Sequence, residues 1–232
     1  MNDILKQLFN HHPYKQNELK ELVFGDKNVA VMLSNGAIGV CSTLCHSFKH
    51  RENILGNPDF TNYEHRVLVN AWVNANSNYI YPIQGHSDIF DAFDFTEYSQ
   101  VVMVGYFGSL AQKLQEQNVN LKVFDLDEHE KPVEPLQNLK ATLEKADVVI
   151  LTATSISNNT FNGLIDNVSS HGKIFILGPS TPITPFLFSL PTIAGLFGAQ
   201  FQPFDYEVLN AISGGGGTRS FLNRMEKVFL FR

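Results

Sequence analysis

The sequence predicts an α/β protein in which a small α+β unit precedes a mostly parallel β-sheet with helices on both faces. From residue 99 onward, continuous apolar runs at 100–104, 147–151 and 173–177 alternate with segments whose apolar residues recur at helical spacing. Continuous apolar runs are typical of strands covered on both faces, and their alternation with helices is typical of parallel sheets. In the first half, an Asn-Gly pair between two β-rich runs predicts an antiparallel hairpin.

The first 98 residues predict the α+β unit and a connector. Residues 28–33 and 37–43 are the β-rich runs, and the turn between them suits Asn and Gly because both tolerate positive φ. Apolar residues at helical spacing predict helices over 3–9, 16–24 and 63–75. Residues 77–98 form a connector rich in aromatic and acidic residues, with a short helix expected within 88–95. We place the domain boundary near Ser99, so the domains expected are 1–98 and 99–232.

The second domain is predicted from the alternation of strands and helices. The expected strands are 100–104, 121–124, 147–151, 173–177 and 227–231. Helices are expected from residue 109, over 136–146 and 161–168, and after Asp205, whose side chain suits a helix N-cap. Residues 174–204 carry no charge, but five prolines interrupt them. We interpret this stretch as a buried strand followed by a proline-rich wall, because a membrane-spanning helix needs an uninterrupted backbone.

Composition and charge exclude several classes of protein. The 44% apolar content is too high for disorder, and 23 Asp and Glu against 17 Lys and Arg give a net charge of −6, which argues against nucleic-acid binding. Only 17% of the residues are charged and 12% are aromatic, so we expect a homo-oligomer, specifically a dimer. Two cysteines are too few for a disulfide scaffold, and the polar start of the sequence lacks a secretory apolar core. We therefore expect a cytoplasmic protein with no nucleic-acid and no membrane partner.

Small polar loops follow the predicted parallel strands, at the edge where open sheets bind ligands. The first loop, Gly105-Tyr106-Phe107-Gly108, opens a helix whose N–H groups suit an anion; alternatively, its glycines only permit a tight turn. Asp125 ends the next strand, where a carboxylate suits a ribose hydroxyl or a cation, or serves only as a cap.

Three further loops extend this polar edge. Residues 152–160 hold hydroxyls and amides, which suit a ligand or cap the next helix, and residues 178–182 read Gly-Pro-Ser-Thr-Pro. The four-glycine run 214–217 is costly to order, so it suggests close backbone approach to a ligand or subunit; the alternative is a flexible connector. Arg219 follows the run and suits an anionic ligand.

Metal-ligand candidates are sparse. Cys41, Cys45 and His46 form a C-x₃-C-H pattern, with His50 four residues later, although a buried structural cysteine is the commoner outcome. A second candidate cluster is His86 with acidic residues at 88 and 91, which are otherwise solvent-facing acids of the connector. Neither G-x-S-x-G nor HExxH is present. The sequence thus leaves open whether the chain is an enzyme.

Several motifs together resemble a known family. VVMVGYFG (101–108), ADVVILTATSISNNTF (146–161), GPSTPITPFLF (178–188) and GGGGTRSF (214–221) resemble domain of unknown function 364, a family associated with heavy-metal chelation. VAVMLSNGAIGVCST and AWVNA (71–75) resemble its usual N-terminal partner, domain of unknown function 4213.

The resemblance implies an enolase-N-terminal-like first domain packed on a Rossmann-like second domain, with the site in the cleft between them. The site residues expected from the resemblance and from the loops are Asn74, Gly105, Tyr106, Phe107, Asp125, Thr154, Asn158, Thr160, Gly178, Ser180, Thr181, Gly215 and Gly216.

Three hypotheses follow for the function. The first is binding of a small anionic or metal-complexed ligand in this cleft, with a divalent or heavy metal as the implied cofactor. The second is a Rossmann-type enzyme that uses a nucleotide-derived cofactor, either S-adenosylmethionine or NAD, through Asp125 and the glycine turn. The third is a metal carrier that uses Cys41, Cys45 and His46.

Overall fold

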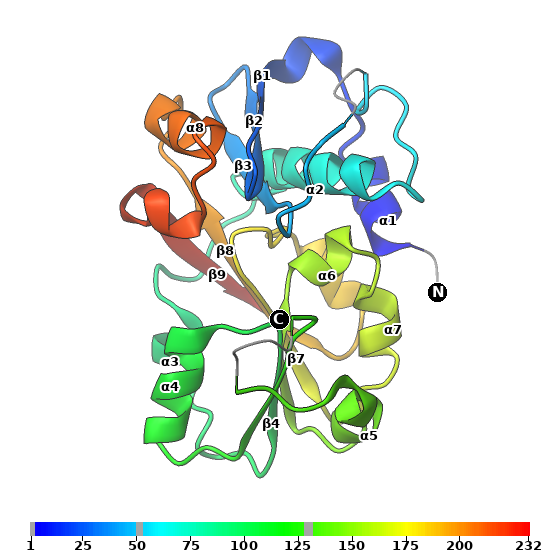
Figure 1. Cartoon of the computed structure of the whole chain (residues 1–232), viewed down its shortest axis with the longest axis vertical. Helices are drawn as coiled ribbons and strands as arrows, with labels where there is room; N and C mark the ends of the chain where they lie inside the picture. The colour runs from blue at the N-terminus through cyan, green and yellow to red at the C-terminus, as the bar shows by residue number, and fades with distance from the viewer. Residues whose placement is uncertain (1–2, 50–52, 128–131) are drawn as a thin grey trace.

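The chain folds around two β-sheets. The computed structural model describes residues 3–49, 53–127 and 132–232 (Figure 1). The first sheet is antiparallel, in the order β1-β2-β3, with β1 at Leu19–Phe24, β2 at Asn28–Leu33 and β3 at Ile38–Ser42. Two helices, α1 (Ile4–His11) and α2 (Tyr63–Ser77), belong to the same part of the molecule. The predicted hairpin is confirmed, since β2 and β3 pair antiparallel and Gly36 in the turn has a φ of 88°.

The helix expected over 16–24 is wrong. One turn of 3₁₀-helix, η1 (Gln16–Glu18), is followed by β1, which pairs antiparallel with β2. The apolar residues at 19, 22 and 23 fit a helix face equally well, and so short a segment cannot be assigned from periodicity alone. Pairing with a strongly β-forming neighbour decided the outcome, because strand preference depends on packing context.

The second sheet has six strands in the order β5-β4-β6-β7-β8-β9. All neighbouring pairs are parallel except β8 and β9, so the predicted mostly parallel sheet is confirmed. The strands are β4 (Val101–Val104), β5 (Leu121–Phe124), β6 (Val148–Thr152), β7 (Lys173–Leu177), β8 (Ile193–Gln200) and β9 (Glu226–Phe231).

Helices cover both faces of this sheet, as predicted. Alternate residues of β4 belong to two different cores, Val102 to one and Met103 to the other. The core around Met103 contains residues of α3 (Ile89–Ala92) and α4 (Gly108–Glu116), and the core around Val102 contains residues of α5 (Leu139–Leu143), α6 (Thr154–Ser157) and α7 (Phe161–Ile165). Figure 1 shows these two sets of helices on opposite sides of the strands.

The stretch expected as a proline-rich wall contains an additional strand. It begins with β7 and the 3₁₀-helix η3 (Pro185–Ser189), and then forms β8. Two glycines obscured β8, since glycine is depleted in strands. Gly195 lies so close to the ring of Phe175 that an added Cβ would come within 2.7 Å of it, so aromatic packing in the core requires the glycine.

The last helix joins the two halves of the molecule. Helix α8 (Tyr206–Ser213) packs Val208 and Leu209 against Ala30 and Val40 of the first sheet. The 3₁₀-helices η4 (Thr218–Ser220) and η5 (Leu222–Arg224) precede β9, and η2 (Leu136–Asn138) precedes α5. An element from beyond residue 99 therefore completes the core of the first sheet. Among the described residues, the helices are all too short or too polar to cross a bilayer.

Candidate functional site

The six-stranded sheet reverses its strand order at β4. Strand β4 lies between β5 and β6, which are the next two strands in the chain. The loops after β4 and β6 therefore leave toward opposite faces, which opens a crevice beyond their carboxyl ends. A cavity of about 790 Å³ lies at this edge, lined by the loops after β4, β5, β6 and β7. Asn28, Ser42, Leu44 and Cys45 of the first half also line it, so the cavity is a cleft between the two halves.

Most of the predicted site residues line this cleft. Those that do are Gly105, Tyr106, Phe107, Asp125, Thr154, Asn158, Thr160, Gly178 and Ser180. Cys45 was expected only as part of a metal site with Cys41 and His46, and Thr218, which follows the glycine run, was not expected at all; both residues line the cleft. The position of Thr218 directly after that run was the one signal in the sequence that could have found it.

The other four predicted residues have structural contacts instead. Asn74 is fully buried on α2, and its Nδ2 donates to the carbonyl of Val40 at 2.9 Å. Thr181 is also buried, and its carbonyl accepts from Nδ2 of Asn78. Gly215 and Gly216 do not line the cleft.

The glycine run serves to end α8. The N–H groups of Gly214, Gly215 and Gly216 donate to carbonyls of the last turn of that helix. The carbonyl of Gly216 accepts from Nδ2 of Asn28 at 3.2 Å, which ties the run to β2. Close backbone approach is thus present at these glycines, but the partner is this chain itself.

The turn after β4 is built on a glycine and a carboxylate. Gly105 has a φ of 94°, and an added Cβ would lie 2.6 Å from Cβ of Thr152, so a larger residue would both strain the backbone and clash. Oδ2 of Asp125 accepts from the N–H of Tyr106 at 2.6 Å, and its Oδ1 accepts from the N–H of Asp127 at 2.8 Å. Both carboxylate oxygens therefore hold loop backbone.

The loop after β6 is held by its own hydroxyl and amide groups. Oγ1 of Thr152 and Oγ1 of Thr154 lie 3.0 Å apart, and Ser155 donates to the carbonyl of Thr152 at 2.7 Å. Oδ1 of Asn158 accepts from both the N–H and the hydroxyl of Thr160. Thr160 is the N-cap residue of α7, but its side chain makes no capping hydrogen bond to that helix, so the helix-capping alternative is not observed at this residue. Thr154, Asn158 and Thr160 line the cleft.

The loop after β7 is fastened to the first half of the chain. Oγ of Ser180 accepts from the N–H of Ser42 at 3.0 Å, and its carbonyl accepts from Nδ2 of Asn70 at 2.9 Å. Asn70 is fully buried on α2. These bonds fix one wall of the cleft against β3 and α2.

The candidate metal residues of the C-x₃-C-H pattern do not come together. Cys41 is fully buried, whereas Cys45 is exposed at the cleft. Burial raises the pKa of the Cys41 thiol to about 11, against opposing hydrogen bonds from Ser157, Ser180 and Asn70. His46 pairs through Nε2 with Glu64 at 3.2 Å.

The remaining metal candidates are also dispersed. His50 lies outside the described residues. His86 pairs with Glu226 at 2.8 Å, and Asp88 pairs with Lys227 at 3.2 Å, so the second expected cluster is replaced by two ion pairs. Within 3–49, 53–127 and 132–232, no three His, Cys, Asp or Glu residues are grouped so that they could hold a metal ion.

The described residues that line the cleft carry a net negative charge. Among the described residues that line it, Asp125 and Asp127 are the charged ones, and none is Lys, Arg or His. The N-terminus of α4 begins beside it at Gly108, but a helix terminus is equivalent to only about half a positive charge. The two carboxylates therefore outweigh it. Apolar side chains, including Leu44, Leu126 and Leu164, form much of the remaining wall.

Comparisons with known proteins agree on one family. Residues 88–231 match the model of domain of unknown function 364 (DUF364), whose description reads "Putative heavy-metal chelation". None of the curated proteins matches the chain. Two solved structures of proteins of unknown function from this family share the fold.

The first of these structures, from Desulfitobacterium hafniense, has a TM-score of 0.78 and 21% identity, and the alignment covers 99% of this chain and 97% of that one. The second, from Pyrococcus horikoshii, has a TM-score of 0.83 and 19% identity over 99% and 98% of the two chains. Since the family model matches more than half of the sequence and both of these relatives share the fold along nearly their whole length, this chain belongs to the domain of unknown function 364 family.

Proposed function

We propose that this protein binds a small metal complex in the cleft between its two halves. The observation that carries the proposal is the charge of the cleft: two carboxylates and one exposed thiol line it, and none of its described lining residues is basic. Of the two ligand classes that the sequence allowed, a metal-complexed ligand suits this lining. An anion is disfavoured because it would face Asp125 and Asp127, and none of the described lining residues offers it a cation.

The proposed ligand is a metal complex rather than a bare ion. A protein site for a bare borderline metal ion such as Zn²⁺ supplies three or four side-chain ligands. No such group exists among the residues that the structure describes. A metal that arrives with its own organic chelator needs only one or two donors from the protein. The apolar walls suit the organic part, and about 790 Å³ is within the range of small-molecule sites.

Cys45 is the donor best suited to the metal. Thiolate sulfur favours soft and borderline metals, and this thiol is exposed at the cleft, whereas that of Cys41 is enclosed. The enzyme alternative has less support, because both oxygens of Asp125, the residue expected to meet a ribose, accept hydrogen bonds from loop backbone. The family description also concerns metals rather than nucleotides.

We extend the proposal to the organisation of the chain. The residues 1–98 correspond to the enolase-N-terminal-like domain that resembles domain of unknown function 4213, and residues 99–232 correspond to the Rossmann-like domain. The three-stranded antiparallel sheet and the reversal of strand order at β4 support this division. A cytoplasmic homodimer without nucleic-acid or membrane partners remains our prediction from composition.

Isothermal titration with a defined probe tests the proposed ligand class. We expect the dication Zn²⁺–terpyridine, which has open coordination positions and an aromatic body, to bind more tightly than free Zn²⁺ and than ADP. Cys45→Ser and Asp127→Asn should each weaken the binding of Zn²⁺–terpyridine about tenfold. Ser170→Ala, at an exposed position outside the cleft, serves as the matched control. Tighter binding of ADP, or equal binding of the probe by wild type and Cys45→Ser, would contradict the proposal.

A further inference from the structure

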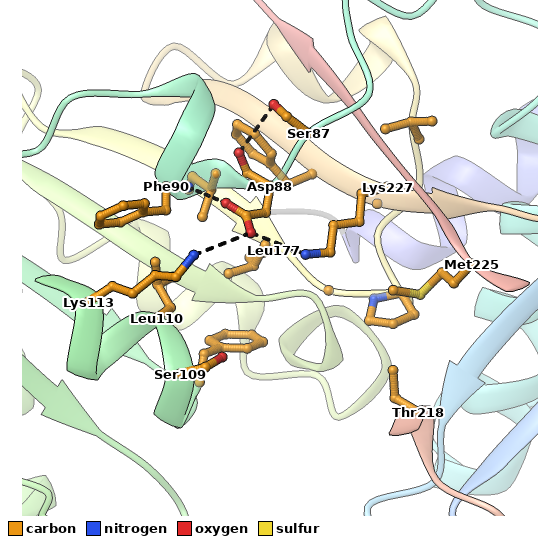
Figure 2. A pocket seen from close by; sticks show the side chains of 17 residues that line it. Ser87, Asp88, Phe90, Ser109, Leu110, Lys113, Leu177, Thr218, Met225 and Lys227 are labelled. Atoms are coloured by element: carbon orange, nitrogen blue, oxygen red, sulfur yellow. Dashed lines mark hydrogen bonds and ion pairs between the residues drawn. The ribbon is translucent and has the colours of Figure 1, made fainter. Parts of the chain in front are cut away.

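A second, smaller cavity lies on the other side of the loop after β4. It has a volume of about 180 Å³ and is formed by α3, α4 and the strands β8 and β9 (Figure 2). Five residues line both cavities and form the wall between the two: Phe107, Leu177, Gly178, Pro179 and Thr218. The family description does not refer to this cavity. Of the residues that line it, the sequence motifs pointed to Phe107 and Gly178, but as residues of the cleft, and to Asp88, but as part of a metal cluster.

The interior of the second cavity is apolar. Its lining includes Ile89, Leu110, Leu177, Phe197 and Val228, of which all but Leu177 are buried. Apolar cavities of about 150 Å³ accept a benzene ring. The volume therefore suits one aromatic ring or an aliphatic body of similar size.

Charged side chains stand together at the rim. Oδ2 of Asp88 lies 3.2 Å from Nζ of Lys227 and 3.9 Å from Nζ of Lys113. Oδ1 of the same carboxylate accepts from the backbone N–H groups of Phe90 and Asp91 and so caps α3. Figure 2 shows both ammonium groups directed at this one carboxylate from opposite sides.

The rim has an excess of positive charge. Two lysines face a single aspartate, which leaves a net charge of +1 among the charged residues that line the cavity. Burial opposes ionisation of Asp88, but the hydrogen bond and charge of Lys227, the N–H of Asp91 and the charge of Lys113 together lower its pKa, so it is ionised at neutral pH.

The lysines also retain hydrogen-bonding capacity. An ammonium group has three donors, and the 3.9 Å separation between Lys113 and Asp88 exceeds hydrogen-bond length. The side chains of Lys113 and Lys227 are 45% and 47% exposed, so a ligand at the rim can reach both. Lys113 also lies over the ring of Phe90, with its Nζ 4.7 Å from the ring centroid.

We propose that this cavity binds a small carboxylic acid with an apolar body, such as an aromatic monocarboxylate. The ring would lie among Ile89, Leu110 and Phe197, and the carboxylate would accept hydrogen bonds from Lys113 and Lys227. This cavity and the proposed metal-complex site should bind different ligands, because the charged residues at its rim are net positive whereas the described residues of the cleft are net negative. It shares a wall with that site through Phe107 and Gly178.

Three nearly isosteric probes separate charge from shape. Benzoate is an anion, benzamide is neutral and benzamidine is a cation, and all three have the same ring. In isothermal titration we expect wild type to bind benzoate about tenfold more tightly than benzamide and to bind benzamidine more weakly still. Equal affinities for benzoate and benzamide, or tighter binding of benzamidine, would overturn the proposal.

Variants locate the site. Lys113→Met and Lys227→Met should each lower benzoate affinity about fivefold, whereas Lys145→Met, an exposed control outside both cavities, should not. Asp88→Asn keeps a good N-cap for α3 and removes the competing carboxylate, so benzoate affinity should rise severalfold, a gain that a folding defect cannot mimic. No gain in Asp88→Asn, together with no loss in the lysine variants, would overturn the proposal.

The test also distinguishes the two sites. Cys45→Ser alters the cleft and should leave benzoate affinity unchanged. If Cys45→Ser abolishes benzoate binding, benzoate occupies the cleft and the second site is refuted. If Zn²⁺–terpyridine fails to bind while benzoate behaves as expected, the proposed function fails and the second site stands.

Discussion

Two cysteines four residues apart have opposite surroundings. Cys41 lies on β3 with no exposed surface, whereas Cys45 lies in the loop after β3 with a φ of 61°. The thiolate is the form that reacts and binds metals, and burial raises the pKa of Cys41 to about 11. At the scale of single residues, only one of the two thiols is therefore chemically available.

Alkylation tests this difference. With iodoacetamide at about pH 8, the native protein should gain one adduct, at Cys45, and the denatured protein should gain two, as measured by intact-mass and peptide spectrometry. Native Cys45→Ser should gain none over the same period. Modification of Cys41 at a rate comparable to that of Cys45 would show that its burial does not protect it.

At the scale of elements, Arg66 of α2 connects three helices. It is 3% exposed; its Nε donates to the carbonyl of Ser157 at 2.9 Å, and one of its terminal nitrogens donates to the carbonyl of Ile156 at 2.7 Å. The other terminal nitrogen bonds to Asp3, the N-cap of α1, and to the carbonyl of Phe60. A cation at the C-terminal end of α6 satisfies carbonyls that lack helical partners. Arg66 thus fixes the loop after β6, one wall of the cleft, against the first half.

Arg66→Met should lower the free energy of unfolding by about 3 kcal/mol, because it leaves Asp3 without its buried cation and two buried carbonyls without donors. Urea denaturation monitored by Trp72 fluorescence measures the change. The control is Lys15→Met, which removes an exposed lysine paired with Glu18 and should cost no more than about 1 kcal/mol. A loss below about 1 kcal/mol in Arg66→Met would show that this connection is not needed.

At the scale of the whole molecule, weakly acidic side chains, namely tyrosine hydroxyls and a cysteine thiol, are buried where the two halves meet. The hydroxyl of Tyr79 donates to the carbonyl of Ile38 at 2.7 Å and accepts from the N–H of Phe201 at 3.0 Å, so it joins β3 to the end of β8. Burial raises the pKa of Tyr79 to about 12, against opposing backbone hydrogen bonds. Burial, together with Cys41 and Cys45, also raises the pKa of Tyr63.

These shifts predict that stability falls in alkaline solution. Above about pH 9, the unfolded chain releases protons from Cys41, Tyr63 and Tyr79 while the folded chain retains them, so the free energy of unfolding decreases as pH rises. Urea midpoints measured between pH 7.5 and 11 should decline steadily above pH 9. Tyr79→Phe should reduce this decline, and Tyr206→Phe, at an exposed tyrosine, should leave it unchanged. A flat profile up to pH 11 would contradict the assigned burial.

Local patterns in the sequence were sufficient for much of the fold. The continuous apolar runs at 100–104, 147–151 and 173–177 became β4, β6 and β7, and the Asn-Gly turn became the hairpin of β2 and β3. These predictions succeeded because the burial of a strand and the geometry of a turn depend mainly on residues that are neighbours in the sequence. The segment 16–24 failed because its apolar spacing fitted two structures. Strand β8 was missed because its two glycines make room for groups from other segments, aromatic rings at Gly195 and the side chain of Ile183 at Gly198.

The sequence by itself determined that small polar loops gather at one edge of a parallel sheet, because topology places the carboxyl ends of such strands together. Only the tertiary structure decided which of those residues face the cleft. Asn74 and Gly216 make structural contacts, and Asp125 lines the cleft while both of its oxygens bond to loop backbone. Cys41 is buried, whereas Cys45 is exposed. Side-chain direction, burial and the approach of Lys113 and Lys227 to Asp88 depend on elements more than 20 residues apart, and no local pattern encodes those distances.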